Sequence, residues 1–207
     1  MSVMQDILNF LSTLRLTYMT EIDVTGFENF NKKPGGFKPS WIILHHSYSS
    51  DGFTRNWDSI KRYHMSYRFN GDIISEEQYT KLLNQKIDGL LEKPWHDVGY
   101  HFGIENDHGK LTVFPGRLIG EIGSHAKGFN DKSIGICLVG NYDICKPDAD
   151  RLHILSHLCR QLQLEFKIPR DQVIGHRETY QLLKGPVQKS CPGAEFDLVG
   201  FRTLLRD

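Results

Sequence analysis

Apolar residues recur at helical spacing in some segments of the chain and form short continuous runs in others, and this difference separates candidate helices from candidate strands. Spacings of three and four residues predict helices over these segments: about 3–15, 54–66, 75–92, a long helix from Asp148, and a last helix from near Phe196. Two of the segments open with a Ser-x-x-Gln capping box, at Ser2 and at Ser75, which is typical of a helix N-terminus. The Gly- and Pro-containing stretch NKKPGGFKP after the first segment is typical of a surface connector.

Short apolar runs predict strands instead. Ile42 to Leu44 form one run, which ends at His45, and QVIGH forms another, which ends at His176. The segments HFGIE and KLTVF flank the turn NDHG and predict a hairpin. SIGICLVG, over 133–140, is apolar almost throughout, as expected of a strand buried on both faces. Because strands and helices alternate, we expect an α/β fold: a single domain with a central mixed β-sheet flanked by helices.

The length of the chain favours one functional domain. A chain of 207 residues is long enough for one sizeable hydrophobic core. No internal repeat, low-complexity tract or clear domain boundary is visible in the sequence. We expect residues 1–40 to form an N-terminal helix and connector, and residues 41–207 to form the functional domain.

The charge balance argues against polyanionic partners. Lys and Arg number 25 and Asp and Glu number 25, so the formal net charge is zero, and we expect neither nucleic acid nor membrane as a partner. No stretch approaches the roughly 18 apolar residues of a membrane span. The N-terminus, MSVMQDILNFLSTLRL, lacks the regions of a signal peptide. We therefore expect a cytoplasmic, monomeric protein that leaves the cell only through lysis or another non-standard route.

Two of the predicted strands end in histidine, and side chains at strand ends can converge in space. Cys191 lies 15 residues beyond His176, in the segment KSCPG. Two imidazoles and one thiolate suit zinc, and a fourth position left to water is typical of a catalytic site. The spacing alone is a weak signal, because single histidines are more often structural and the chain has neither HExxH nor a CxxC pair. A metal site in a cleft at the strand ends and purely structural histidines both remain open.

We expect the cysteines to be unlinked. The chain is too large and too rich in core residues to need disulfides for stability. Cys137 and Cys159 fall in a predicted buried strand and a predicted helix, where a free thiol acts as a small apolar residue. The remaining two are Cys145 and Cys191.

Five segments together resemble one protein family. WIILHHS, WHDVGYHFGI, GSHAKGFNDKSIGICLVGN, VIGHRET and KSCPG occur in the order found in zinc-dependent N-acetylmuramoyl-L-alanine amidases of the type 2 class. That class includes phage lysozyme-type amidases and the animal peptidoglycan recognition proteins. The resemblance runs from Trp41 to about Gly193. It implies zinc-dependent hydrolysis of the amide bond between N-acetylmuramic acid and L-alanine in peptidoglycan, with one zinc ion per chain.

The resemblance also implies the metal ligands. The family's two zinc histidines match His45 and His176, and its cysteine ligand matches Cys191. Side chains alternate along a strand, so His46 should point to the face opposite His45. We therefore expect His46 to be a packed or supporting residue rather than a ligand.

Two catalytic residues follow from the same resemblance. The family's catalytic tyrosine matches Tyr100, in WHDVGYH, and its catalytic lysine matches Lys189. Residues two apart in an extended segment face the same side, so Lys189 and Cys191 can both point at the metal. A nearby ammonium group also favours the thiolate. Without the resemblance, Lys189 would be interpreted as a surface charge and Tyr100 as a core residue at the rim of a cleft.

Four further polar residues lie within the matching segments. His101 and His125 either line the cleft or are structural histidines. Asn130 and Asn141 flank the strand SIGICLVG and have no assigned chemistry.

Two regions depart from the family pattern. Residues at about 67–93 separate the predicted helix from WHDVGYH by more than is expected of compact family members. This insert carries its own predicted helix and could reshape one wall of the cleft. The first 40 residues match nothing in the family core.

The resemblance leaves several functions to compare. A phage or prophage endolysin is favoured, because the His-His-Cys set resembles the phage type and wall-recycling amidases more often carry an acidic third ligand. A non-catalytic peptidoglycan-binding recognition module is the main alternative, but loss of the cysteine is expected there. A metal-free interaction protein with structural histidines is the third.

Overall fold

The computed structural model describes residues 38–49 and 55–205. Its main sheet has five strands in the order β6-β5-β7-β1-β8. Only β6 runs antiparallel to its neighbour, so the sheet is mixed, and the predicted α/β fold is confirmed. The strand bounds are β1 Trp41–His46, β5 Phe102–Asp107, β6 Lys110–Pro115, β7 Ser133–Leu138 and β8 Val173–Gly175. The helix predicted over 3–15 lies outside the described residues.

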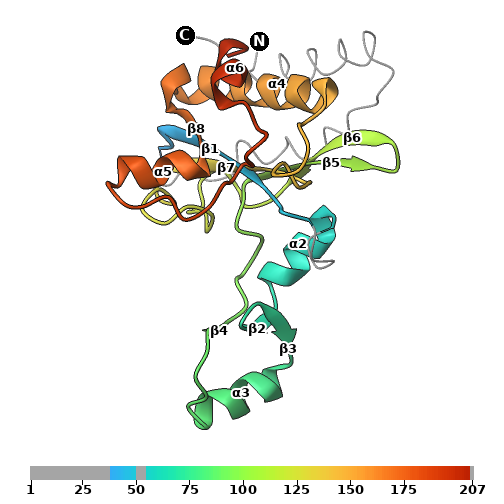
Figure 1. Cartoon of the computed structure of the whole chain (residues 1–207), viewed down its shortest axis with the longest axis vertical. Helices are drawn as coiled ribbons and strands as arrows, with labels where there is room; N and C mark the ends of the chain where they lie inside the picture. The colour runs from blue at the N-terminus through green and yellow to red at the C-terminus, as the bar shows by residue number, and fades with distance from the viewer. Residues whose placement is uncertain (1–37, 50–54, 206–207) are drawn as a thin grey trace.

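The two faces of β1 contribute to different parts of the molecule. Ile42 and Leu44 belong to the largest core cluster, together with apolar residues of two helices, α4 (Ala149–Phe166) and α6 (Leu198–Thr203). Figure 1 shows both helices on one side of the sheet. Ile43, between them, packs with Ala126 and Phe129 in a separate cluster. Because side chains alternate, His45 lies on the Ile43 face, away from α4.

The central strand β7 is buried along its whole length, as its apolar sequence predicts. It pairs in parallel with β1, and His45 lies opposite Cys137 in the register. The predicted hairpin is β5 and β6, joined by His108 and Gly109. Both of these residues have positive φ, 51° and 85°, as a two-residue type I′ turn requires.

Helix starts agree with local capping. The Asp148 side chain accepts from the backbone N–H of Arg151 at 2.8 Å and begins α4. Two predicted helices begin slightly later than expected. Asn56 caps α2 (Trp57–His64), and Asp197 caps α6.

The strand that was predicted to end at His176 is one residue shorter. Strand β8 ends at Gly175, and His176 is the first residue of a helix that the periodicity did not predict, α5 (His176–Leu182). The cause is local, because the Glu178 carboxylate accepts from the backbone N–H of Gly175 at 2.8 Å. An acidic side chain at the third helical position satisfies an otherwise unpaired donor at a helix start.

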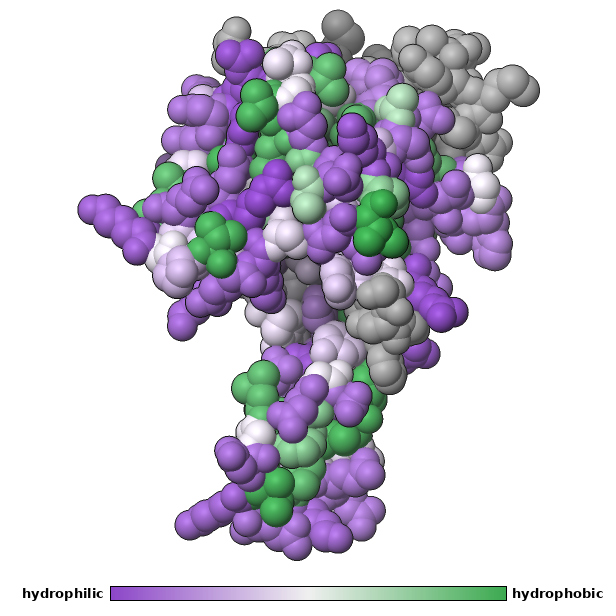
Figure 2. Space-filling view, viewed as in Figure 1, coloured by the Kyte–Doolittle hydropathy of each residue, from purple (hydrophilic) through white to green (hydrophobic). Residues whose placement is uncertain are grey.

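Residues 67–93 form a projection that we call the lobe (Figure 1). It contains a second, antiparallel sheet in the order β3-β2-β4 and one helix. The bounds are β2 Tyr67–Phe69, β3 Asp72–Ile74, α3 Glu76–Asn84 and β4 Leu91–Glu92. Figure 2 shows the lobe as a narrow extension below the main body, with apolar side chains on its surface.

The helix predicted over 75–92 is wrong in its second half. The capping box of Ser75 and Gln78 is present, but α3 ends at Asn84. Lys86 and Gly89 then adopt positive φ, 50° and 144°, which a helix does not allow. The chain turns there, and β4 pairs with β2 instead of continuing the helix.

Candidate metal centre

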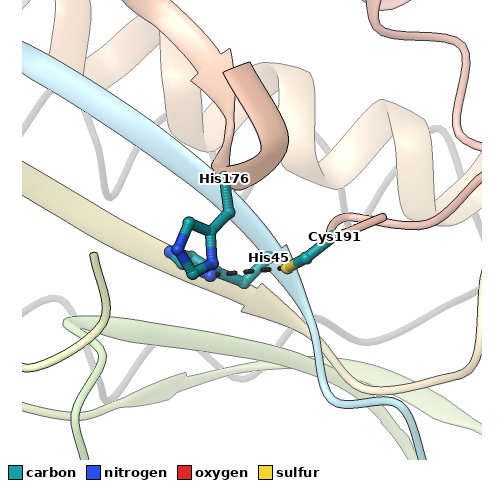
Figure 3. Close-up of side chains that lie close together, drawn as sticks. All are labelled: His45, His176 and Cys191. Carbon is teal, nitrogen blue, oxygen red and sulfur yellow. Dashed lines mark hydrogen bonds between the residues drawn. The ribbon is translucent and has the colours of Figure 1, made fainter. Parts of the chain in front are cut away.

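Three side chains from separate parts of the chain converge beside the main sheet (Figure 3). They are His45 at the end of β1, His176 at the start of α5, and Cys191 in the loop after α5. One nitrogen or sulfur atom of each lies within 4.8 Å of the others. His45 is 1% exposed and Cys191 is 7% exposed. The structure therefore brings together all three of the expected ligands.

The spacing of these atoms fits a tetrahedral metal ion. Nδ1 of His45 lies 3.5 Å from Sγ of Cys191 (Figure 3). Zinc bonds of about 2.0–2.1 Å to nitrogen and about 2.3 Å to sulfur, at a tetrahedral angle, separate the two atoms by about 3.6 Å. The His45–Cys191 pair needs almost no movement to hold such an ion.

The loop that carries Cys191 is fixed from the helix that carries His176. Arg177 donates its backbone N–H to the carbonyl of Cys191 at 2.7 Å. Its guanidinium group donates to three carbonyls of the same loop, those of Ser190, Gly193 and Phe196. Arg177 thus links the helix start that carries His176 to the loop that carries Cys191.

Asp143 holds the same loop from the other side. Its carboxylate accepts from the Ser190 hydroxyl at 2.8 Å and from the backbone N–H of Ala194 at 2.7 Å. Burial acts to raise the pKa of Asp143, but these hydrogen bonds and the charges of His46 and Arg177 together keep it below its usual value. Sequence reasoning missed both Arg177 and Asp143, and only the adjacency of Arg177 to His176 could have indicated the former.

Burial controls the protonation of the ligands. It lowers the pKa of His176 to about 4, with a further contribution from Lys189. Burial also lowers the pKa of His45 well below its usual value, and His176 and His125 add to this effect. Both imidazoles are therefore neutral at pH 7, with lone pairs available to a metal.

The pKa of the Cys191 thiol shifts in the opposite direction, upwards. Burial raises its pKa to about 12, although a hydrogen bond from the backbone of His46 and the charge of Lys189 oppose the rise. The Lys189 ammonium group lowers the pKa of Cys191, as expected, but burial raises it by more. The thiolate needs the charge of a bound cation, as is usual for cysteine ligands. All four cysteines of the chain are free thiols.

Tyr100 and Lys189 line the same cavity as the three ligands. This cavity, which we call the cleft, has a volume of about 560 Å³. The Tyr100 ring lies 5.0 Å from the His45 ring. Burial raises the pKa of Tyr100 well above its usual value, so the hydroxyl keeps its proton. Lys189 is exposed at the rim.

The remaining histidines of the matching segments have different surroundings. His46 is packed against Tyr142, and its Nδ1 accepts from the Tyr142 backbone N–H at 3.1 Å. His101 is structural, because its ring bonds to Gly135 N–H and to the Glu121 carbonyl, both at 3.0 Å. His125 instead contacts one of the expected ligands, with its Nδ1 3.0 Å from Nε2 of His45.

Asn130 supports this last residue. Its side-chain oxygen accepts from the backbone N–H groups of His125 and Ala126, at 2.9 and 2.8 Å. Asn130, a turn-type residue with no chemistry predicted from the sequence, therefore positions the loop that carries His125.

One wall of the cleft comes from the base of the lobe. His64 and Trp95, which flank the lobe in sequence, line the cleft, and their rings lie 4.6 Å apart. Among the described residues that line the cleft, none belongs to 67–93 itself. The lobe therefore lies outside the cleft, and only its two junctions contribute to the wall.

Comparison with known proteins identifies the family. Residues 35–194 match the family model described as N-acetylmuramoyl-L-alanine amidase. The chain belongs to this family. The expected family resemblance is thus confirmed, and the match includes the lobe and every residue of the candidate metal centre.

Two curated relatives of the amidase family illustrate the sequence similarity. The chain is 42% identical over 110 residues to the endolysin of Klebsiella phage KP32, covering 52% of this chain and 65% of that protein. It is 34% identical over 104 residues to the peptidoglycan-recognition protein LB of Drosophila melanogaster, covering 50% of this chain and 40% of that protein. The chain thus spans less than two thirds of the length of these relatives.

A solved structure supports the fold. The endolysin amidase LysCS from Clostridium intestinale URNW superposes with a TM-score of 0.51 and 23% sequence identity. The superposition covers 81% of this chain and 83% of that chain. Within the described residues, no helix has both the length and the apolarity that crossing a membrane requires.

Proposed function

We propose that this protein hydrolyses the amide bond between N-acetylmuramic acid and L-alanine in peptidoglycan, with one zinc ion held by His45, His176 and Cys191. The observation that carries the proposal is the convergence of these three side chains, two of them buried and His176 half-buried, within 4.8 Å in a member of the amidase family. Two neutral imidazoles and one thiolate are a zinc set typical of a catalytic site, because they leave a position open.

The proposed chemistry divides between the metal and the chain. When bound, zinc supplies positive charge that acidifies water and polarises the amide carbonyl. Two neutral histidines and one thiolate leave a net charge of about +1 at the site, so this effect is not cancelled. The three ligands fix the position of that charge in the cleft.

Tyr100 and Lys189 act on the substrate in this proposal. Tyr100 stays protonated because it is buried, so its hydroxyl can donate a hydrogen bond to oxygen that becomes negative during the reaction. Lys189 places an ammonium group at the exposed rim, where it stabilises the same charge.

We further propose that the biological role is that of a phage or prophage endolysin, a monomer that stays in the cytoplasm until lysis. The named phage relative supports this role. The third ligand is a cysteine rather than an acidic residue, which favours the endolysin over a wall-recycling amidase.

A non-catalytic recognition module is the second candidate, because a peptidoglycan-recognition protein is also among the relatives. A module that only binds has no need for a thiolate ligand. The presence of Cys191 beside His45 and His176 favours hydrolysis.

Digestion of purified peptidoglycan tests the proposal. The wild type should release L-alanine amino groups and free lactyl carboxyl groups, as identified by mass spectrometry. A chelator should stop this release, and added zinc should restore it. New reducing sugar ends, or cuts within the peptide, would contradict the assigned bond.

The matched variants are Cys191→Ala and Cys145→Ala. Cys145 is exposed and lies outside the ligand group, so it controls for the loss of a thiol. Cys191→Ala should lose zinc and activity, and Cys145→Ala should keep both. Full zinc content in Cys191→Ala would rule out this ligand set. Wild-type protein that holds peptidoglycan without cutting it would favour the recognition module.

A further inference from the structure

We propose that His125 is a positioning residue for the metal site: it holds the His45 ring through Nε2 and so directs Nδ1 of His45 at the metal. This inference rests on the proposed ligand set of His45, His176 and Cys191. It assigns a role to a residue that is not itself a ligand.

The two nitrogens of His45 have different partners. Nδ1 lies 3.5 Å from Sγ of Cys191, within the ligand group. Nε2 lies 3.0 Å from Nδ1 of His125, on the opposite side of the ring. The two imidazoles meet edge to face, at 85° and with 5.0 Å between their centroids. Nδ1 is therefore the nitrogen of His45 that is available to a metal.

His125 is held in place by its surroundings. A Cβ atom added at Gly135 would come within 2.6 Å of the His125 ring, and one added at Gly123 within 2.5 Å. The His125 ring thus fills space that is open because Gly123 and Gly135 have no side chain. Its backbone N–H is bound by Asn130 at 2.9 Å. The imidazole has little freedom to turn away from His45.

This arrangement specifies one tautomer of His45. When Nδ1 holds a metal ion, Nε2 carries the proton and donates it in a hydrogen bond to Nδ1 of His125. Ligating histidines are commonly oriented in this way by an acceptor for their second N–H, and loss of such an acceptor typically costs 10–100-fold in metal affinity. The acceptor is usually a carboxylate, a carbonyl or water, whereas here it is a second imidazole.

Two substitutions separate positioning from packing. His125→Phe keeps the ring volume between the two glycines but removes the acceptor. His125→Asn loses volume but keeps an acceptor, because its Oδ1 lies near the position of Nδ1. His108→Asn is the matched control, since His108 is exposed in the hairpin turn and its positive φ suits asparagine.

The primary measurement is zinc affinity by competition with a chelator, with thermal melts of the metal-free proteins alongside. His125→Phe should bind zinc about 10–100-fold more weakly than wild type, with an unchanged melting temperature of the metal-free protein. His125→Asn should keep more of the affinity than His125→Phe, and His108→Asn should match wild type. The reverse order, with His125→Phe like wild type and His125→Asn weakened, would show a packing role and overturn the proposal.

A second measurement needs no variant. In the ¹⁵N spectrum of zinc-loaded wild type, Nε2 of His45 should carry a proton that is coupled across the hydrogen bond to Nδ1 of His125. A proton on Nδ1 of His45 would overturn the proposal even if both variants failed to fold. Wild type that binds zinc through the three ligands but cuts no peptidoglycan would refute the proposed function and leave the positioning role intact.

Discussion

The metal-ligand group and the lobe are assembled from contacts at different distances in sequence. His45 and Cys191 are 146 residues apart, and they meet because Arg177 and Asp143 hold the loop after α5 beside the end of β1. In the lobe, each strand pairs with a segment that is close in sequence. His45 and Cys191 are buried and His176 is half-buried, whereas the lobe exposes large apolar side chains such as Leu83 and Leu90.

The lobe is instead secured at its base. Arg68 is 1% exposed and makes two hydrogen bonds to the Glu92 carboxylate, at 3.2 and 3.1 Å. Its guanidinium group also lies over the Tyr63 and Trp95 rings. The metal site and the lobe should therefore fail separately. Changes at the ligands should abolish the metal site, and changes at the base should loosen the lobe without removing the metal.

The largest effect is expected at the histidine pair of β1. His45→Ala should lose the metal and with it all activity, because His45 supplies a buried ligand atom. His46→Ala should keep most of its metal, because the His46 ring packs on Tyr142. Elemental analysis of both purified variants checks this. An equal loss of zinc from the two would show that the ligand is the other member of the pair.

The next largest effect is expected at the two residues that line the cleft without binding metal. Tyr100→Phe and Lys189→Ala should keep their zinc, because neither side chain belongs to the ligand group. Each removes a group that acts on charge formed during the reaction, so kcat should fall by roughly one to three orders of magnitude. Binding to intact walls should change little. Wild-type rates in variants that are fully loaded with zinc would contradict both assigned roles.

The sequence predicts the sheet better than it predicts the surroundings of the site. Strand β7 is an almost continuous apolar run, and helix α4 repeats apolar residues at helical spacing over 18 residues, so the sequence pattern finds both. The short helix α5 was missed because one carboxylate, that of Glu178, ends the strand a residue early. The second half of the helix predicted over 75–92 failed because Ile87 and Leu90 have helical spacing but are exposed.

Within the site, the family motifs predict the three expected ligands, which the structure brings together, but they do not predict the residues that support them. Asp143 and Arg177 reach Cys191 through loop carbonyls and N–H groups, and such contacts leave no periodic signal in the sequence. The contact between His125 and His45 joins residues 80 positions apart, so it depends on the completed sheet.

A smaller effect is expected at the base of the lobe. Arg68→Met keeps an apolar stem but removes the bonds to Glu92, and hydrogen bonds to charged groups contribute about 1.5–3 kcal/mol. The free energy of local opening of the lobe should therefore fall by about 2 kcal/mol. Amide exchange in residues 67–93 should become faster, while zinc affinity stays within about twofold of wild type. Lys81→Ala, on the exposed surface of α3, is the control. Zinc loss in Arg68→Met would show that the two regions are coupled.

The smallest effect is expected from the titration of His64, at the junction of lobe and cleft. Burial lowers its pKa from 6.5 to about 3, and the charges of Arg68 and Arg117 act in the same direction. Between these two pH values the unfolded chain binds a proton that the folded chain does not, so the free energy of unfolding falls as the pH falls from about 6.5 towards 3.

His64→Asn removes the titrating group, and its Oδ1 can still accept from the Gly99 N–H that bonds to Nδ1 of His64. Urea unfolding of the metal-free proteins at pH 7 and pH 5 should show a smaller loss of stability in His64→Asn than in wild type. Metal-free protein is used so that the ligand histidines contribute equally to both proteins. An identical loss in the two proteins would show that His64 is not a source of acid sensitivity at the base of the lobe.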